Sequence, residues 1–420
     1  MWLINVHSYA LEEFLGEGET PPYAILSHTW SRPASAEVTF REMRGDLAFA
    51  QSKPCFMKIY NSCVIAKSHD LSWVWVDTCC IDKTSSADLS EAINSMYRYY
   101  RDSAECLVYL ADVSYHQPGA SRAKKLEAIG QSRWFSRGWT LQELIAPQER
   151  HFFDVNWDEI PWGADLLRTL SRAGNVAVDV LEHRHNLPNI SVAERMTMAS
   201  KRSTTRGEDM AYCLFGIFDV NLPILYGEGA KKAFRRLQLE IMAASPLDQS
   251  IFAWRGADRS NSGLLANSPS DFASTPSIYF PRYGRLVPFS MTNMGLSITC
   301  TLVDVPEEKD ITPSRPNKKI RRVLAPLQCH PGANESSSFC LYLESMAELR
   351  FHINDKWLPA YRRVRCSEWK LVPRETIAHA KSETIIISED KQLEALLSRL
   401  SMSSQLPTRI GNTREIVETT

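Results

Sequence analysis

Residues 87–144 constrain the fold of this chain more than any other stretch, because three structural signals follow one another there. The first is an amphipathic helix, and the second is the apolar run 106–110, which predicts a core strand that ends at Asp112. The third is a new helix that opens near Gly138 and stops at Pro147. The apolar positions of the first helix have the spacing of a buried face, and they are Leu89, Ile93, Met96, Tyr97 and Tyr100.

Strands and helices alternate throughout the N-terminal part of the chain. Short apolar runs at 23–27, 71–76 and 151–154 predict further strands, and residues 57–67 predict a helix. This alternation favours an α/β fold in which a parallel sheet has helices on both faces. Ligands of such sheets bind beyond the C-terminal ends of the strands. The side chains expected at those ends are Ser27, His28, Trp30, Asp77, Asp82 and Asp112.

The pattern of the sequence changes twice further along. Residues 191–245 are mostly helical in pattern, whereas the chain after Pro246 consists of short β-prone runs separated by turn residues. The β-prone runs predict an antiparallel sandwich or partial barrel, with strands at 250–254, 296–303, 320–324, 339–343 and 384–387. The predicted organisation is an α/β domain at 1–165, a helical extension at 166–246, a β-rich C-terminal domain at 247–395 and a disordered tail at 396–420.

Composition and charge narrow the classes of function. The net charge of −1 gives no global attraction to nucleic acid or to an anionic membrane. No uninterrupted apolar segment reaches the roughly 18 residues of a membrane helix, and the N-terminus lacks a basic signal-peptide region. We therefore expect a cytoplasmic protein with no nucleic-acid or membrane partner.

The ten cysteines predict neither disulfides nor a metal site. The sequence contains no C-x-x-C motif, and the adjacent Cys79 and Cys80 are poorly placed to bind one metal ion together. Most cysteines lie in apolar runs, where a thiol behaves as a small hydrophobic side chain. Cys79 and Cys80 beside His28 carry no local protease signature, so we interpret them as buried thiols.

Three sequence blocks, at 23–30, 75–82 and 137–143, resemble the three signature blocks of the fungal HET (heterokaryon incompatibility) domain. They read YAILSHTW, WVDTCCID and RGWTLQE, and they occur in the order of the family with plausible spacing. Lys83 departs from the family, which usually has glutamine after the second block. The resemblance extends through about residue 260, and it implies a role in non-self recognition and regulated cell death.

HET domains in turn resemble divergent TIR domains, which have a flavodoxin-like sheet and a helix that begins W-C-x-x-E. Residues 139–143 fit that pattern except for Thr140 at the cysteine position. The resemblance implies that Glu143 is a catalytic residue for cleavage of the nicotinamide–ribose bond of NAD. NAD is then a substrate and not a cofactor. The same resemblance implies a substrate-binding site built from Ser27, His28, Trp30, Asp77, Asp82 and Trp139.

The residues also allow a second interpretation of the same positions. Thr140 and Glu143 have capping-box spacing, so the carboxylate of Glu143 could only cap its helix. Asp77 and Asp82 could be turn aspartates, and His28 could be a hydrogen-bonded loop residue. The alternative function is a non-catalytic death-signalling scaffold that self-associates and recruits a protein partner. A catalytic role requires Glu143 to be partly exposed at the C-terminal edge of the sheet.

Overall fold

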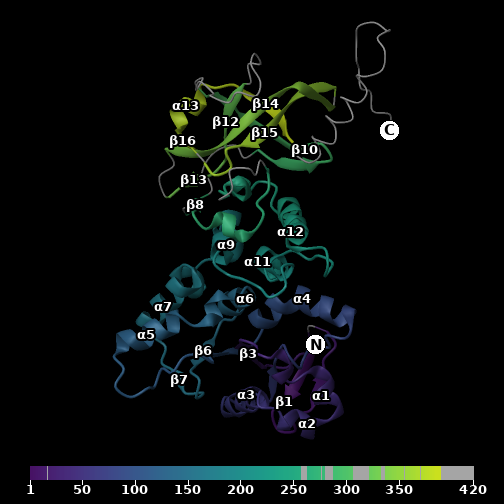
Figure 1. The fold of residues 1–420 in the computed structure, drawn as a ribbon, viewed down its shortest axis with the longest axis vertical. Helices are drawn as coiled ribbons and strands as arrows, with labels where there is room; N and C mark the ends of the chain where they lie inside the picture. Colours follow the sequence, from purple (N-terminus) through teal and green to yellow (C-terminus); the bar gives the residue numbers. More distant parts are fainter. Residues whose placement is uncertain are drawn as a thin grey trace.

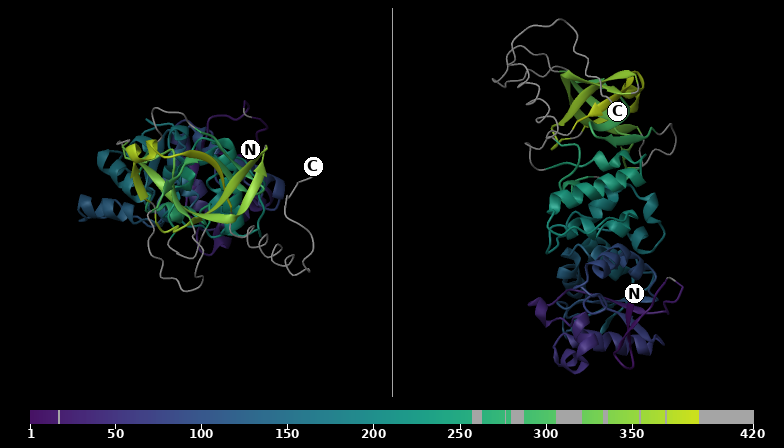
Figure 2. Two further views of the ribbon diagram at one scale, coloured as in Figure 1. Left: turned by 90° about the horizontal axis from the view of Figure 1, so that it is seen from above. Right: turned by 90° about the vertical axis from the view of Figure 1, so that its right-hand side faces the viewer.

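The computed structural model describes residues 1–16, 18–256, 263–275, 277–279, 287–305, 321–332, 336–353, 355–368 and 370–388. Three regions follow one another along the long axis of the molecule (Figure 1). An α/β region contains the N-terminus, a helical region lies in the middle, and a β-rich region forms the other end, as the side view of Figure 2 also shows. The predicted class, an α/β domain followed by helices and then strands, is confirmed at this level.

The first sheet has seven strands in the order β2-β1-β4-β3-β5-β6-β7. Its four inner strands, β4, β3, β5 and β6, pair in parallel, as the sequence predicts. The outer strands pair antiparallel, an edge arrangement that the sequence analysis did not anticipate. The strands are β1 (Trp2–Asn5), β2 (Leu11–Glu13), β3 (Ala24–His28), β4 (Trp73–Trp75), β5 (Glu105–Tyr109), β6 (Arg150–Phe153) and β7 (Glu159–Ile160).

Helices connect the parallel strands and cover the sheet. The helix predicted from Leu89 onward is α4, which begins after its Ser85 cap and buries Ile93, Met96 and Tyr100. Trp75 of β4 packs on this helix, with its ring 5.9 Å from that of Tyr100, so β4 is an interior strand as predicted. The helices of this region are η1 (Ala34–Ala36), α1 (Phe40–Gly45), α2 (Leu47–Ser52), α3 (Phe56–Ser68), α4 (Ser86–Arg101), α5 (Arg122–Gly130), η2 (Arg133–Ser136), α6 (Thr140–Ile145) and α7 (Ala164–Gly174).

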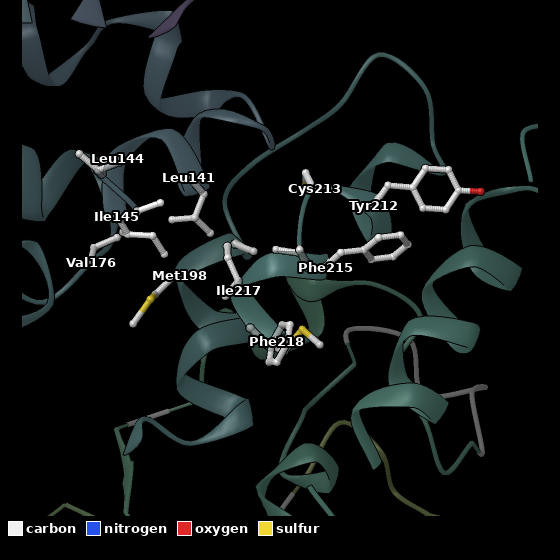
Figure 3. Close-up of a cluster of buried hydrophobic side chains, with 14 of the residues drawn as sticks. Leu141, Leu144, Ile145, Val176, Met198, Tyr212, Cys213, Phe215, Ile217 and Phe218 are labelled. Carbon is white, nitrogen blue, oxygen red and sulfur yellow. The ribbon is translucent and has the colours of Figure 1, made fainter. Parts of the chain in front are cut away.

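The helical region shares its hydrophobic core with the short helix α6. Leu141, Leu144 and Ile145 of α6 face Met198 and Ile217 of the helical region (Figure 3). Every residue of α6 is buried, because the helix also packs against β3, α4 and η2. The remaining helices of this region are α8 (Val178–Leu181), η3 (Leu187–Asn189), α9 (Val192–Ala199), α10 (Asp209–Tyr212), α11 (Phe215–Phe218) and α12 (Ala230–Ala244).

The β-rich region is a curved, mostly antiparallel sheet that curls round on itself in the top view of Figure 2. The prediction of a strand at 250–254 is wrong, because η4 occupies this segment after Asp248 caps it through the Ser250 amide. The other four predicted strands in this region correspond to β10, β12, β14 and β17, although residue 320 lies outside the described residues. The elements are η4 (Gln249–Phe252), η5 (Pro269–Phe272), β8 (Ile278–Tyr279), β9 (Phe289–Thr292), β10 (Gly295–Thr301), β11 (Val303–Asp304), β12 (Arg322–Pro326), β13 (His330–Pro331), β14 (Ser337–Ile353), β15 (Lys356–Val364), β16 (Lys370–Pro373), α13 (Arg374–Ala378) and β17 (Ser382–Ile387).

Some sequence predictions concern boundaries and termini. The divisions at 165 and 246 stay predictions, and one continuous hydrophobic core crosses both positions. The tail predicted at 396–420 lies outside the described residues. All ten cysteines are buried and free, so the predicted absence of disulfides agrees with the structure. Within the described part of the chain, no helix combines the length and the apolar character needed to cross a membrane.

Candidate functional site

The C-terminal edge of the parallel strands is where the sequence predicts a site. Across the sheet the four parallel strands lie in the order β4-β3-β5-β6, although β3 comes first in the chain. The chain goes from β3 to one side of the sheet to form β4 and to the other side to form β5 and β6, so the direction of winding reverses between β3 and β5. A reversal of this kind opens a crevice outside the strand ends, and ligands of doubly wound sheets bind there. Ser27 and His28 are the last two residues of β3, on the side of this crevice.

A buried cluster forms where α6 meets the end of β3, and we call it the Glu143 cluster (Ser27, Tyr100, Trp134 and Glu143). The hydroxyl of Ser27 donates a hydrogen bond to Oε2 of Glu143. The indole Nε1 of Trp134 donates to the same Ser27 oxygen at 2.8 Å. The hydroxyl of Tyr100 donates to the carbonyl of Leu26 at 3.1 Å, and burial and then the charge of Glu143 raise the pKa of Tyr100 well above its ordinary value.

Glu143 is only 7% exposed, and this burial changes its chemistry. Burial raises the pKa of the Glu143 carboxyl to about 8, although the hydrogen bond from Ser27 opposes the shift. The carboxyl is therefore mostly protonated at neutral pH and carries no charge in this conformation. The expectation that a catalytic Glu143 is partly exposed is not met, because α6 packs among β3, α4, η2 and α8 and all of its residues are buried.

The capping interpretation of Glu143 is also wrong. Trp139 is the cap position of α6, and its side chain makes no capping hydrogen bond. The hydroxyl of Thr140 donates instead to the carbonyl oxygen of Trp134 at 2.5 Å, and it accepts a hydrogen bond from Arg202 at 2.9 Å. The carboxyl of Glu143 is consequently committed to Ser27 across the sheet and not to its own helix terminus.

A second group lies at the same edge and is more open; we call it the Asp77 group (His28, Trp30, Asp77 and Lys83). Asp77 accepts hydrogen bonds from Nε1 of Trp30 at 2.8 Å and from Nε2 of His28 at 3.1 Å. The Asp77 side chain is 23% exposed, whereas that of His28 is 1% exposed. Burial favours a higher pKa for Asp77, but the nearby Lys83 ammonium and the His28 hydrogen bond outweigh it and hold that pKa well below the ordinary range.

His28 is held from both sides, which determines its tautomer. Nζ of Lys58 lies 3.2 Å from Nδ1 of His28, and an ammonium group can only donate hydrogen bonds. Nδ1 must therefore accept, and the ring proton sits on Nε2, where it is donated to Asp77. Lys58 is paired in turn with the buried Glu37 at 2.5 Å. With both ring nitrogens engaged, His28 is hydrogen-bonded as in the second interpretation and is not free to act as a general base, but it ends β3 and does not lie in a loop.

The exposed face of Trp30 is already in contact with a cation. Nζ of Lys83 lies 4.0 Å from the centre of the Trp30 ring, within the range of a cation–π contact. Lys83 is the position where this chain departs from the usual glutamine of the resembled family. A planar cationic ligand would therefore have to displace the Lys83 side chain before it could stack on Trp30.

The structure places the two remaining predicted residues away from these groups. Nε1 of Trp139 points to Asp209 of α10 in the helical region, at 3.4 Å. The Asp82 carboxylate accepts hydrogen bonds from the amide and the hydroxyl of Thr84, at 2.9 and 2.6 Å, as a turn aspartate does. Of the predicted residues, Ser27 and Glu143 contact each other, and His28, Trp30 and Asp77 form the adjoining group.

Sequence reasoning missed four residues that organise this edge: Glu37, Lys58, Tyr100 and Trp134. The sequence predicts Tyr100 on the buried face of its helix, but only as an apolar side chain. Lys58 has the clearest missed signal, because it is a basic residue inside the helix whose apolar face contains Ile59 and Cys63. A long basic side chain inside such a face requires an acidic partner when it is buried.

A separate cavity of about 810 Å³ lies between the α/β region and the helical region. It is lined by residues of α4, α9 and the segment after α11, together with Ile145 and Ala146 at the end of α6. None of the predicted site residues lines it. The cavity is therefore distinct from the C-terminal edge of the sheet.

Comparisons with known proteins match the region that carries this edge. The family described as "Heterokaryon incompatibility protein (HET)" matches residues 23–126, and a "Domain of unknown function (DUF8212)" matches residues 232–277. The chain is 45% identical over 228 residues to "Vegetative incompatibility protein HET-E-1" of Podospora anserina. The match covers 54% of this chain but 16% of that protein, so this chain corresponds to a small part of it. No solved structure matches the chain. The chain is therefore similar to heterokaryon incompatibility (HET) proteins, over residues 23–126 in the family match and over 228 residues in the Podospora anserina protein.

Proposed function

We propose that this chain acts in vegetative incompatibility, in non-self recognition that ends in regulated cell death. The observation that carries the proposal is the 45% identity over 228 residues with a vegetative incompatibility protein. The HET match at 23–126 includes Ser27, His28, Trp30 and Asp77, the residues that gather at the C-terminal edge of the sheet. The match therefore includes the Asp77 group, whereas Glu143 lies beyond the matched residues.

For the mechanism we infer cleavage of NAD at the Glu143 cluster. When the parallel strands are numbered by their order in the chain, they lie across the sheet as 2-1-3-4 (β4-β3-β5-β6). Flavodoxin-like sheets have this order, which supports the resemblance to TIR domains. Ser27 and Glu143 then lie beside the crevice where such sheets bind ligands. A carboxyl with a strongly shifted pKa at such a position is typical of functional sites. Packing alone does not require a carboxyl there, because a glutamine would fill the same space without a titratable group.

The chemistry follows from the charges of the substrate. The bond between nicotinamide and ribose breaks with both electrons moving to the nicotinamide nitrogen, and the ribose becomes cationic, as in glycoside cleavage. Water adds to that carbon and releases a proton, so the products are nicotinamide and ADP-ribose. The cationic nicotinamide ring of bound NAD lowers the pKa of a carboxyl within a few ångströms by about 1–3 units. Substrate binding would thereby ionise Glu143, and the carboxylate would stabilise the ribosyl cation.

This mechanism requires the site to open. Glu143 is 7% exposed, so NAD reaches it only after α6 or the segment following β3 moves. The Asp77 group is the more open group at this edge, so we expect NAD to enter past the Lys83–Trp30 contact and the Trp30–Asp77 hydrogen bond. The described conformation is thus the closed state of the proposed enzyme.

The burial of Glu143 also favours a second candidate function, a non-catalytic scaffold that signals death through self-association and partner recruitment. In that function the Glu143 cluster only fastens α6 to β3, and a neutral carboxyl is sufficient for this role. The two candidates differ in whether cell death depends on the carboxylate. They therefore make opposite predictions for a glutamine at this position.

The experiment expresses the whole chain in fungal cells and measures NAD content and viability. The variants are wild type, Glu143→Gln and the matched control Glu149→Gln, which changes an exposed glutamate a few residues further along. NAD cleavage predicts NAD loss and death with wild type and the control, and neither with Glu143→Gln. Death without NAD loss, unchanged in Glu143→Gln, would establish the scaffold function instead. Survival of cells that express folded wild-type protein would contradict the role in cell death.

A further inference from the structure

The opposite edge of the same sheet holds a cluster of metal-binding side chains that the sequence analysis did not find. We call it the His–Glu cluster, and it consists of His69, Glu105 and His151. His69 follows α3, Glu105 is the first residue of β5, and His151 is the second residue of β6. Their ligand atoms, one from each residue, all lie within 4.8 Å of one another. Three residues far apart in sequence thus converge at the N-terminal edge of the parallel strands.

The spacing of these atoms suits a zinc ion. Nδ1 of His69 lies 2.7 Å from Oε2 of Glu105, and Nε2 of His151 lies 3.5 Å from the same oxygen. Zinc binds nitrogen and oxygen ligands at about 2.0–2.1 Å in tetrahedral geometry, which separates neighbouring ligand atoms by about 3.3 Å. The two distances bracket this value. Small rotations of the two exposed or half-exposed imidazoles would accommodate the ion.

The second observation concerns the free oxygen of Glu105. This residue is 7% exposed, and its Oε1 atom is buried without a hydrogen-bond partner. A buried carboxylate oxygen without a partner is costly, because it has lost its water and gained nothing in exchange. Both imidazoles contact the other oxygen, Oε2, so a cation bound between them would neutralise a buried carboxylate that Oε1 leaves only half satisfied. The incompletely satisfied carboxylate is therefore a second observation that favours a cation beside it.

The third observation is an orienting contact on His151. Its Nδ1 lies 2.8 Å from Oε1 of Glu159, on the side of the ring away from Glu105. A carboxylate that accepts the Nδ1 proton leaves Nε2 with its lone pair directed at the cluster. This carboxylate–histidine arrangement is the one that metal-binding histidines usually have. Without a cation, the Nε2 lone pair of His151 and the negative oxygen of Glu105 would repel each other. A cation that lies between them removes this repulsion.

We propose that His69, Glu105 and His151 bind a divalent transition-metal ion of the zinc class, with water completing the coordination. Two imidazoles and one carboxylate favour such ions over calcium and magnesium, which prefer all-oxygen sites. The His69 side chain is 37% exposed, so the ion can enter from solvent and keep a water ligand. The bound ion ties the end of α3 to two parallel strands. This site departs from the sequence expectation of no metal, which rested on the cysteines alone.

The test uses the purified full chain, stripped of metal with a chelator and kept in a reducing agent that does not bind zinc. Zinc is titrated by calorimetry, and bound metal is counted by elemental analysis. The variants are His69→Ala, His151→Ala and Glu159→Gln, with His7→Ala as a control at an exposed histidine near the N-terminus. Cobalt is a second probe, because a tetrahedral site gives it strong visible absorption.

We expect one zinc ion per wild-type chain and the same binding in His7→Ala. Binding should weaken at least a hundredfold in His69→Ala and His151→Ala, and about 10–100-fold in Glu159→Gln. It should also weaken in acid, since metal ligands must be deprotonated. Equal affinity in wild type and His69→Ala, or no binding to folded wild type, would overturn the proposal. Because His69 is exposed, its variant should fold, and circular dichroism of the metal-free proteins checks this.

Discussion

Each edge of the first sheet has a buried glutamate on which a proposed site depends, and these two glutamates have different chemistry. Glu143 at the C-terminal edge and Glu105 at the N-terminal edge are both 7% exposed. Glu143 contacts the hydroxyl of Ser27, a neutral partner, and its pKa is raised to about 8. Glu105 contacts two imidazoles, which can carry a proton or a metal ion. Two equally buried carboxyl groups can therefore have different chemistry, because their contact partners differ.

The two edges also differ in how far solvent reaches the partners of their buried carboxylates. The Lys58–Glu37 pair lies entirely at the C-terminal edge, with side chains 11% and 6% exposed. The imidazoles of the His–Glu cluster are much more open to solvent. We therefore expect substitutions at the C-terminal edge to affect folding and those at the N-terminal edge to affect metal binding.

The largest expected effect is that of Lys58→Met. The change leaves Glu37 buried without its cation, and breaking a buried ion pair in this way costs about 3–5 kcal/mol. The metal-free His69→Ala variant should lose less, about 1–2 kcal/mol, because His151 stays beside the Glu105 carboxylate when His69 is removed. Urea unfolding of both proteins measures the difference. Comparable losses in the two variants would remove the contrast between the edges.

The next effect concerns pH and the variant Glu143→Gln. Because burial raises the pKa of Glu143 from 4.5 to about 8, the folded chain holds a proton that the unfolded chain releases between these values. This stabilisation is complete below about pH 4.5 and is lost as pH rises toward 8. Wild type should therefore lose stability relative to Glu143→Gln by up to about 1.4 kcal/mol per pH unit in that range. Unfolding at pH 5.5 and 7.5 tests this, and parallel pH profiles for the two proteins would show that Glu143 is ionised when folded.

A smaller effect is expected for Ser27→Ala. The variant removes the donor to Glu143 and the acceptor of the Trp134 indole, and a buried polar group left unpaired costs about 1–3 kcal/mol. Ser136→Ala is the control, since Ser136 is exposed and should change stability by less than about 0.5 kcal/mol. Thermal unfolding at pH 7 compares them. Equal stability of Ser27→Ala and wild type would mean that the Glu143 cluster does not hold α6 in place.

The smallest effect is expected for Asp82→Ala. Its carboxylate is bonded within its own turn to Thr84, so the variant should lose about 1 kcal/mol or less. NAD loss in cells should be unchanged, whereas Asp77→Ala, which frees both His28 and Trp30, should reduce it. If the Asp82→Ala variant is stable but causes no NAD loss, Asp82 belongs to the NAD-binding site, contrary to this expectation.

The sequence predicts the sheet better than it predicts the site. The strand β5 and the helix α4 have long apolar patterns, and such patterns depend on local burial alone. The burial of Glu143 depends on contacts between distant parts of the chain, with Ser27 of β3 and Trp134 of η2 packed around its carboxyl, and such contacts leave no local pattern. The His–Glu cluster has the same origin, because its three residues are brought together only by strand pairing and the end of α3.

The most direct test of the proposed NAD cleavage is nicotinamide release from NAD by the purified chain at pH 7. Wild type and Glu149→Gln should release nicotinamide in proportion to the protein added, and Glu143→Gln should release at least a hundredfold less while melting as a folded protein. Release by Glu143→Gln at the wild-type rate, or no release by folded wild type, would contradict NAD cleavage at the Glu143 cluster.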